Sequence, residues 1–186
     1  MSFKANQKVL VIDVESTGLD PTKHSCIEIG AVLMDEELNL VDEYSSLIAP
    51  LPGTEMNADS MAVNKISMEE LKTAPDFKIV IEEFHKRFCE GGSIPTILGW
   101  NVWFDVAFLR GLYEKMGKPW PFGHRFLDLQ SVAQFFSGFQ GVSLEKLVDS
   151  LLKEKPTHRA IDDTRHTAKV FKIFAEKYLT STSPSL

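Results

Sequence analysis

Two acidic residues follow an apolar run near the start of the chain. Asp13 and Glu15 are two residues apart and come directly after Val9–Ile12. Because side chains alternate along a strand, a strand here directs both carboxylates to the same side of a sheet. With 26 acidic residues among 186, chance alone produces about four such pairs, so two solvated acids are the alternative. The apolar run and the Ser-Thr-Gly turn after it favour a site where a central strand leaves the core.

A lone acid, Asp105, lies in the segment Gly99–Leu109, which contains no other charged residue. An acid near the start of a helix can simply complement the helix dipole. Burying a carboxylate among so many apolar side chains is costly, however, unless a cation compensates it. Asp105 is therefore a second candidate for a cation site.

The third candidates are His158 and Asp163, at the start of the last predicted helix. A loop histidine and an acid in a first helical turn are both common without any function. With Asp13, Glu15 and Asp105, however, they bring four carboxylates and one titratable base to predicted strand ends and helix starts. Clustered carboxylates raise one another's pKa values, so such a set is typical of a site for divalent metals. Ligand sets made only of oxygen favour Mg²⁺ or Mn²⁺.

Three segments, in this order, resemble motifs of the DEDDh group of 3′–5′ exonucleases, which includes the proofreading epsilon subunit of bacterial DNA polymerase, ribonuclease T and oligoribonuclease. The motif D-x-E-[TS]-[TS]-G matches Asp13–Gly18, and N-x-x-F-D-x-x-F-L matches Asn101–Leu109. The motif H-x-A-x-x-D matches His158–Asp163 and selects Asp163 over Asp162. The resemblance covers nearly the whole chain.

The resemblance implies a metal-dependent 3′–5′ exonuclease that acts on 3′ ends of single-stranded DNA or RNA and releases nucleoside 5′-monophosphates. It implies two divalent ions, with Asp13 bridging them. Glu15 and Asp163 would bind the ion nearer the attacking water, and Asp105 would hold the other, mainly through water. His158 would be the general base that deprotonates this water. The implied substrate-binding residues are Ser16, Thr17, Gly18, Leu19, Asn101 and Phe104.

Two other functions are alternatives: a module that binds nucleic-acid ends without cutting them, and an interaction subunit of a replication complex. All five catalytic candidates are present, which favours the enzyme. Trp100 stands where many relatives have a histidine, a position without a direct catalytic role. The chain ends soon after its last predicted helix, so we expect no polymerase association through a C-terminal extension. A homodimer is compatible with the sequence.

The candidate residues require a sheet whose strand ends meet the starts of helices. Apolar runs and alternating patterns predict strands, the first three of which form an antiparallel meander, and 3.6-residue patterns predict helices. The predicted strands are Lys8–Val14, Cys26–Met34, Val41–Ile48 and Thr96–Gly99. The predicted helices are Phe77–Phe88, Asn101–Met116, Asp128–Phe136, Ser143–Leu152 and Arg159–Tyr178.

This order of elements predicts an α/β protein with a mixed sheet. The resemblance specifies the ribonuclease H-like fold, a five-stranded mixed sheet flanked by helices. We expect one exonuclease domain over residues 1–186, with a core at about 8–178 and a polar tail at 180–186.

The composition indicates an ordinary globular protein with a net charge of −6. Such a chain repels a polyanion overall, so nucleic-acid binding must depend on local features. Cys26 and Cys89 have no metal-ligand spacing and are expected to be free thiols in a reducing compartment. We find no signal peptide and no apolar run long enough for a membrane span, so a soluble, cytoplasmic protein without a membrane partner is expected.

Several other residues are candidates for contacts with a nucleic-acid strand. Aromatic residues that could stack on bases are Trp103, Trp120 and Phe122, for which core packing is the favoured alternative. Cations that could line an approach path are Lys115, Lys118 and Arg159, for each of which ordinary surface charge is favoured. Glu28, in the second predicted strand, is either a partner of the site or an acid at the sheet edge.

Overall fold

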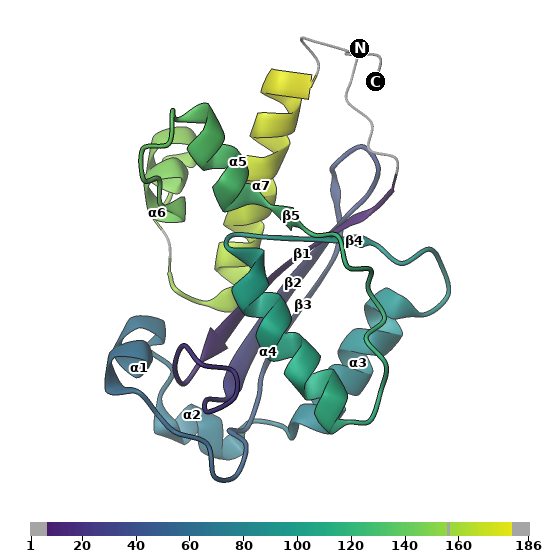
Figure 1. Ribbon diagram of the computed structural model, residues 1–186, viewed down its shortest axis with the longest axis vertical. Coiled ribbons are helices and arrows are strands. Elements are labelled where there is room, and N and C mark those ends of the chain that lie inside the picture. Colours follow the sequence, from purple (N-terminus) through teal and green to yellow (C-terminus); the bar gives the residue numbers. More distant parts are fainter. Residues whose placement is uncertain (1–6, 156, 180–186) are drawn as a thin grey trace.

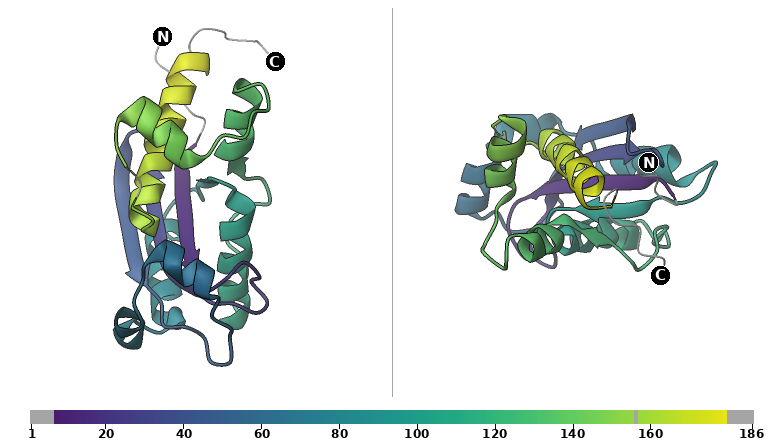
Figure 2. Two further views of the ribbon diagram at one scale, coloured as in Figure 1. Left: turned by 90° about the vertical axis from the view of Figure 1, so that its left-hand side faces the viewer. Right: turned by 90° about the horizontal axis from the view of Figure 1, so that it is seen from above.

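The chain folds into a five-stranded mixed sheet with helices on both faces (Figures 1 and 2). The computed structural model describes residues 7–155 and 157–179, so the predicted tail at 180–186 lies outside the described residues. The strands are β1 (Val9–Ser16), β2 (Cys26–Met34), β3 (Leu40–Leu47), β4 (Thr96–Gly99) and β5 (Leu127–Asp128), and they lie in the order β3-β2-β1-β4-β5. The first three are antiparallel, whereas β4 and β5 run parallel to β1. This confirms the predicted α/β class, the meander and the mixed sheet.

Strand β1 lies at the centre of the sheet and is covered on both faces. Leu10, Ile12 and Val14 pack into the larger core cluster with residues of α3 (Phe77–Cys89) and α4 (Val102–Lys115). Val9 and Val11 point the other way and pack with α7 (Ala160–Leu179). Since side chains alternate along a strand, the two acids that follow on β1 continue the set that faces α7.

The remaining helical segments are short. They are α1 (Ala58–Asn64), α2 (Met68–Thr73), α5 (Leu129–Phe136), α6 (Leu144–Leu147) and a π-helical turn over Val148–Leu152. The sequence analysis did not predict α1 and α2, which begin at capping residues: the Asn57 side chain accepts two backbone N–H groups, and Ser67 forms a capping box with Glu70. No helix in the described part of the chain is long and apolar enough to cross a membrane.

Candidate active site

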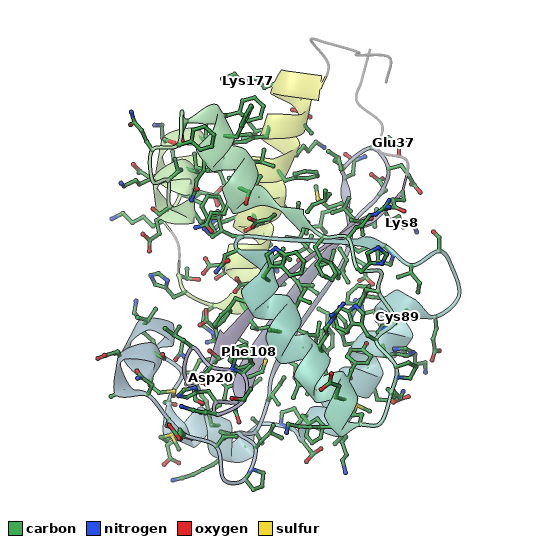
Figure 3. All side chains as sticks on the ribbon, in the orientation of Figure 1. Lys8, Asp20, Glu37, Cys89, Phe108 and Lys177 are labelled. Carbon is green, nitrogen blue, oxygen red and sulfur yellow. The ribbon has the colours of Figure 1, made fainter. Side chains whose placement is uncertain are left out.

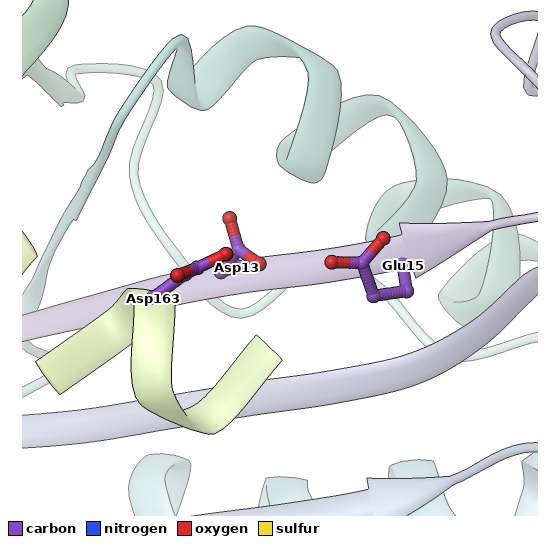
Figure 4. Close-up of side chains that lie close together, drawn as sticks. All are labelled: Asp13, Glu15 and Asp163. Atoms are coloured by element: carbon purple, nitrogen blue, oxygen red, sulfur yellow. The ribbon is translucent and has the colours of Figure 1, made fainter. Parts of the chain in front are cut away.

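Three carboxylates from two elements meet at the end of β1. Asp13 and Glu15 of β1 and Asp163 of α7 each place an oxygen so that all three oxygens lie within 4.8 Å of one another (Figure 4). Glu15 and Asp163 come from segments that are almost 150 residues apart in the sequence, so the fold creates this cluster. Its three members are among the residues that the sequence analysis selected as metal ligands.

A glycine lets α7 come close enough to complete the cluster. Gly30 of β2 pairs with Asp13 of β1 in the antiparallel register. A Cβ atom on Gly30 would lie 2.4 Å from the backbone carbonyl of Ala160, which is far inside van der Waals contact. The first turn of α7 therefore rests directly on the sheet beside Asp13, and Asp163 lies less than one turn further along this helix.

A buried glutamate fixes the same end of α7. Glu28 is 2% exposed and accepts hydrogen bonds from Arg159 Nε and Nη2 at 3.0 and 2.7 Å to Oε1. Its Oε2 accepts from the backbone N–H of Ala160 at 3.0 Å. Glu28 also pairs with Glu15 across β1 and β2. A buried carboxylate is stable only when it is compensated, and here a guanidinium and a helix N-terminus compensate it. We refer to Glu28 and Arg159 as the α7 clamp.

Asp105 lies beside the cluster but is not one of its three close members. It is 3% exposed, in the first turn of α4, and its Oδ1 accepts a hydrogen bond from the backbone N–H of Val14 at 2.9 Å. This bond ties α4 to β1 between the two acids of the strand. Asn101 immediately precedes α4 in the left-handed conformation (φ 57°), which asparagine tolerates better than most residues, and its side chain makes no capping bond.

The cluster is electrostatically unfavourable. Burial raises the pKa of Glu15 to about 8, with further contributions from Asp163 and Glu28 that Arg159 partly offsets. Burial also raises the pKa of Asp13, and Asp105 is the charged neighbour that raises it most. The pKa values of Asp105 and Asp163 are raised as well, again mainly by burial. Without a cation, burial and mutual repulsion therefore favour the protonated forms of these carboxyl groups.

His158 lines a pocket of about 260 Å³ together with two members of the cluster, Asp13 and Asp163. Its backbone is left-handed (φ 58°), a conformation that is uncommon for residues other than glycine, and the chain turns sharply there just before α7. The ring atom Nε2 lies 3.8 Å from Oε1 of Glu145, in the first turn of α6. A titratable base and two carboxylates thus share one hollow.

The two adjacent aspartates at the start of α7 differ in their surroundings. Asp162 accepts a hydrogen bond from Thr157 at 2.7 Å and pairs with Arg165 at 3.1 Å. Asp163 faces the cluster, and its Oδ1 is buried without a hydrogen-bond partner among the described residues. The ring atom Nδ1 of His166 lies 3.7 Å from this oxygen, which is too long for a hydrogen bond. A buried carboxylate oxygen without a partner is expected where a cation binds.

A second pocket, of about 340 Å³, adjoins the cluster on the side of Glu15. Ser16, Leu19 and Phe104, which the resemblance had implied as substrate contacts, are in its lining. Leu19 is 79% exposed, so a large apolar side chain stands free at the rim. Val63 of α1 is a lining residue that the sequence analysis missed, because nothing in the pattern of this short helix distinguishes it from an ordinary surface position.

Two other implied contacts have structural roles in this loop. Thr17 is fully buried, and its hydroxyl is bonded to backbone groups of two neighbouring segments. Gly18 packs against the ring of His24, where a Cβ atom would lie 2.2 Å from Cδ2. Neither residue lines the pocket beside Glu15. Asn101 also does not line it, and its side chain is exposed.

The other candidates for contacts with a nucleic-acid strand differ in their burial and in their partners. Phe122 is 4% exposed and lies in the core cluster, and Trp120 packs against this cluster. Lys118 pairs with Glu82, and Arg159 belongs to the α7 clamp. Glu28, which the sequence left open, is therefore a buried partner of the site rather than an edge acid. Trp103 and Lys115 remain exposed on α4.

Comparison with known proteins identifies the family of this chain. A family model of exonucleases, RNase T, matches residues 10–171. A PolC-type DNA polymerase III of Thermotoga petrophila is 36% identical over 173 residues, which are 92% of this chain and 12% of the polymerase. An oligoribonuclease of Acinetobacter baylyi is 27% identical over an alignment of 188 positions, which covers 96% of this chain and 98% of that protein. The solved nuclease domain of 3′hExo, a DEDDh family member bound to rAMP, superposes with a TM-score of 0.75 at 18% identity, over 92% of this chain and 93% of the other.

The chain belongs to the RNase T family of exonucleases. The structural likeness to 3′hExo shows that it has the ribonuclease H-like fold of DEDDh exonucleases. It spans about 12% of the length of its PolC-type relatives and nearly the full length of the oligoribonuclease.

Proposed function

We propose that this RNase T family member is a metal-dependent 3′–5′ exonuclease that hydrolyses the terminal phosphodiester bond of single-stranded DNA or RNA and releases nucleoside 5′-monophosphates. The observation that carries the proposal is the convergence of Asp13, Glu15 and Asp163, whose oxygens lie within 4.8 Å of one another beside the pocket of His158. Asp105 adds a fourth, buried carboxylate that neighbours Asp13 closely enough to raise its pKa.

The residues fit a divalent cation. The donor set is all oxygen, which suits Mg²⁺ or Mn²⁺ rather than Zn²⁺. The buried, unpartnered Oδ1 of Asp163 and the raised pKa of Glu15 are both unfavourable features that a bound cation would relieve. In the proposed arrangement Asp13, Glu15 and Asp163 would hold the ions, and Asp105 would contribute further negative charge beside them. When bound, two such ions activate a water molecule and stabilise negative charge on the scissile phosphate and the leaving oxygen.

The protein's own groups supply the remaining steps. His158, in the same pocket as Asp13 and Asp163, accepts the proton of the attacking water as a neutral imidazole. Glu145, 3.8 Å from Nε2, then stabilises the imidazolium that forms. The pocket beside Glu15 receives the terminal nucleotide, with Leu19 and Phe104 against its base. Its volume of about 340 Å³ lies within the usual range for small-ligand sites.

A metal titration tests this proposal. Purified protein is stripped with chelator and incubated with a labelled single-stranded 12-mer, and Mg²⁺ or Mn²⁺ is then added back. We expect no cleavage in chelator, full recovery with metal, and no recovery for Asp13→Asn. Asp162→Asn, which changes the acid next to Asp163 that points away from the cluster, is the matched control and should stay active. Undiminished cleavage in excess chelator would overturn the proposal.

A further inference from the structure

An open groove of about 730 Å³ runs along the outer side of α4, away from the acidic cluster. One wall is the loop that carries Pro21 and Thr22, and the other is the helix face with Trp103, Ala107 and Arg110. Lys115 closes the far end. In Figure 3, Asp20 marks the loop and Phe108 marks α4. We call this feature the α4 groove.

The groove contains an aromatic side chain that lies outside the hydrophobic core. Trp103 is 59% exposed, whereas large aromatic rings are usually well buried. Its ring meets Phe126 edge to face at a centroid distance of 5.1 Å, so one contact orients it while most of its surface stays open. Stacking of nucleobases on such a ring is a common way to bind single strands without sequence preference.

The groove also contains two cations without acidic partners. Arg110 lies over the rings of Trp120 and Phe126, with Cζ at 5.1 and 5.6 Å from the ring centroids. Its Nε is buried without a hydrogen bond, and within residues 7–155 and 157–179 neither Arg110 nor Lys115 forms an ion pair. By contrast, Lys118, just beyond the end of α4, is paired with Glu82. The rings hold the Arg110 guanidinium in place, and its charge is not neutralised by the protein.

The α4 groove and the pocket beside Glu15, which is proposed to receive the terminal nucleotide, are lined by the same two segments of the chain. Phe104 lines the pocket and Trp103 lines the groove, on adjacent positions of α4. Leu19 lines the pocket and Pro21 lines the groove, on one loop. A strand whose last nucleotide occupies the pocket can therefore pass the exposed Leu19 and continue along α4. From Trp103 to Lys115 the helix is about 18 Å long, which is enough for several nucleotides.

We propose that the α4 groove binds the single strand upstream of its 3′-terminal nucleotide, with a base stacked on Trp103 and phosphates beside Arg110 and Lys115. This inference rests on the proposed exonuclease function and assigns it a substrate longer than a dinucleotide. A groove of this kind would let a chain with a net charge of −6 bind a polyanion at a second place besides the metal site. Glu114 is the one acid in the groove lining, and it opposes phosphate binding there.

Length-dependent kinetics test the inference. We measure kcat and KM for removal of the first nucleotide from oligo-dT and oligo-U of two to twelve nucleotides in Mg²⁺. The wild-type KM should fall as length increases. Trp103→Ala and Lys115→Glu should each raise the KM of the 12-mer about tenfold, the size of one lost stacking or phosphate contact. The dinucleotide KM and the kcat should stay within about twofold, and Glu114→Gln should lower the KM of the 12-mer.

Matched variants outside the groove control for unspecific effects. Phe135→Ala removes another exposed aromatic ring, and Lys86→Glu reverses another exposed lysine, and both should behave as wild type. Equal KM values of wild type and Trp103→Ala on the 12-mer would overturn the inference. So would equal increases for the dinucleotide and the 12-mer, because these would assign Trp103 to the terminal pocket.

A binding measurement separates failure of this inference from failure of the proposed function. Anisotropy of 5′-fluorescein-dT12 in chelator requires no catalysis. If no substrate is degraded but Trp103→Ala weakens this binding about tenfold, the groove assignment holds and the proposed activity fails. If degradation occurs and the variant binds as tightly as wild type, the activity holds and the groove assignment fails.

Discussion

At the residue scale, the acidic cluster is costly to the folded protein. Asp13, Glu15 and Asp163 share a small volume in which burial raises each pKa, so at neutral pH the protein either keeps protons or binds cations. Stability and metal binding must therefore both depend on pH.

The pH dependence of stability follows from Glu15. Its pKa rises from 4.5 to about 8 on folding. Between these values the folded protein holds a proton that the unfolded chain has lost, so stability falls as pH rises through this window. We expect the melting temperature of the metal-free protein to decrease from about pH 5 to 8, and less steeply in Glu15→Gln. Mn²⁺ should raise the melting temperature most at the alkaline end of this range, because the ion binds the deprotonated carboxylates. Differential scanning fluorimetry measures the melting temperatures of the wild type, of Glu15→Gln and of the protein with Mn²⁺. Identical pH slopes of wild type and Glu15→Gln would contradict this account of the cluster.

His158 and Asp163 have different proposed roles that mutations can separate. His158→Ala should lower kcat by roughly 10² to 10⁴-fold, the usual contribution of a general base, and leave metal affinity unchanged. Asp163→Ala should weaken metal binding instead, because it removes one of the three clustered carboxylates. Calorimetric titration with Mn²⁺ gives the affinities. The wild-type rate should rise with pH and level off, because only the neutral ring accepts a proton. A His158→Ala variant with wild-type turnover and pH profile would exclude His158 as the base.

The sequence identifies the residues of the cluster better than it identifies their partners. Asp13, Glu15 and Asp163 stand in motifs with fixed spacing, and the structure brings them together. Glu28 was ambiguous, because its partner Arg159 lies 131 positions away in the sequence. The inward orientation of Thr17 was equally hidden, since the hydrogen bonds that hold its hydroxyl come from two other segments of the chain.

At the element scale, the position of α7 relative to β1 and β2 determines the cluster. Two independent devices fix it: the close contact at Gly30 and the α7 clamp. Gly30 and Glu28 both lie on β2, the strand that pairs with β1 along its whole length. A substitution on β2 that moves the start of α7 should therefore move the Asp163 carboxylate relative to Asp13 and Glu15.

Gly30→Ala tests this dependence. The added methyl group would meet the Ala160 carbonyl at 2.4 Å, so α7 must shift away from the sheet. We expect a loss of roughly 1 to 3 kcal/mol in the free energy of unfolding, typical of overpacking, together with weaker Mn²⁺ binding. Gly92→Ala is the control, because a Cβ atom there meets nothing within 4 Å. Chemical denaturation and metal titration provide the two readouts. Wild-type metal affinity in Gly30→Ala would show that Asp163 does not depend on this contact.

The long helices were predictable from the sequence, whereas helices α1 and α2 and strand β5 were not. The patterns over α3, α4 and α7 repeat for three turns or more, which is enough for apolar periodicity to stand out. Helices α1 and α2 have seven and six residues, too few for a repeat, and their signals are the caps Asn57 and Ser67. Strand β5 has two residues and merges with the start of α5, where the sequence predicts only a helix.

At the scale of the whole molecule, the sheet order brings the site together. Strands β1, β4 and β5 are parallel neighbours, so the loops after β1 and β4 meet at one edge, where α4 begins and ligands bind in open α/β sheets. Local patterns contain no information on this order, and only the resemblance to a family implied five strands. The single domain over 1–186 stays a prediction.

The most direct test of the central claim is the order in which products appear from a linear single-stranded 12-mer in Mg²⁺. We expect a 3′-labelled strand to release labelled mononucleotide from the first time point, while a 5′-labelled strand shortens one nucleotide at a time. A 3′-phosphate should slow both reactions strongly, and a circular strand of the same sequence should resist cleavage. Degradation of the circular strand as fast as the linear one, or early release of mononucleotide from the 5′ label, would contradict the assignment of this acidic cluster to 3′–5′ exonuclease chemistry.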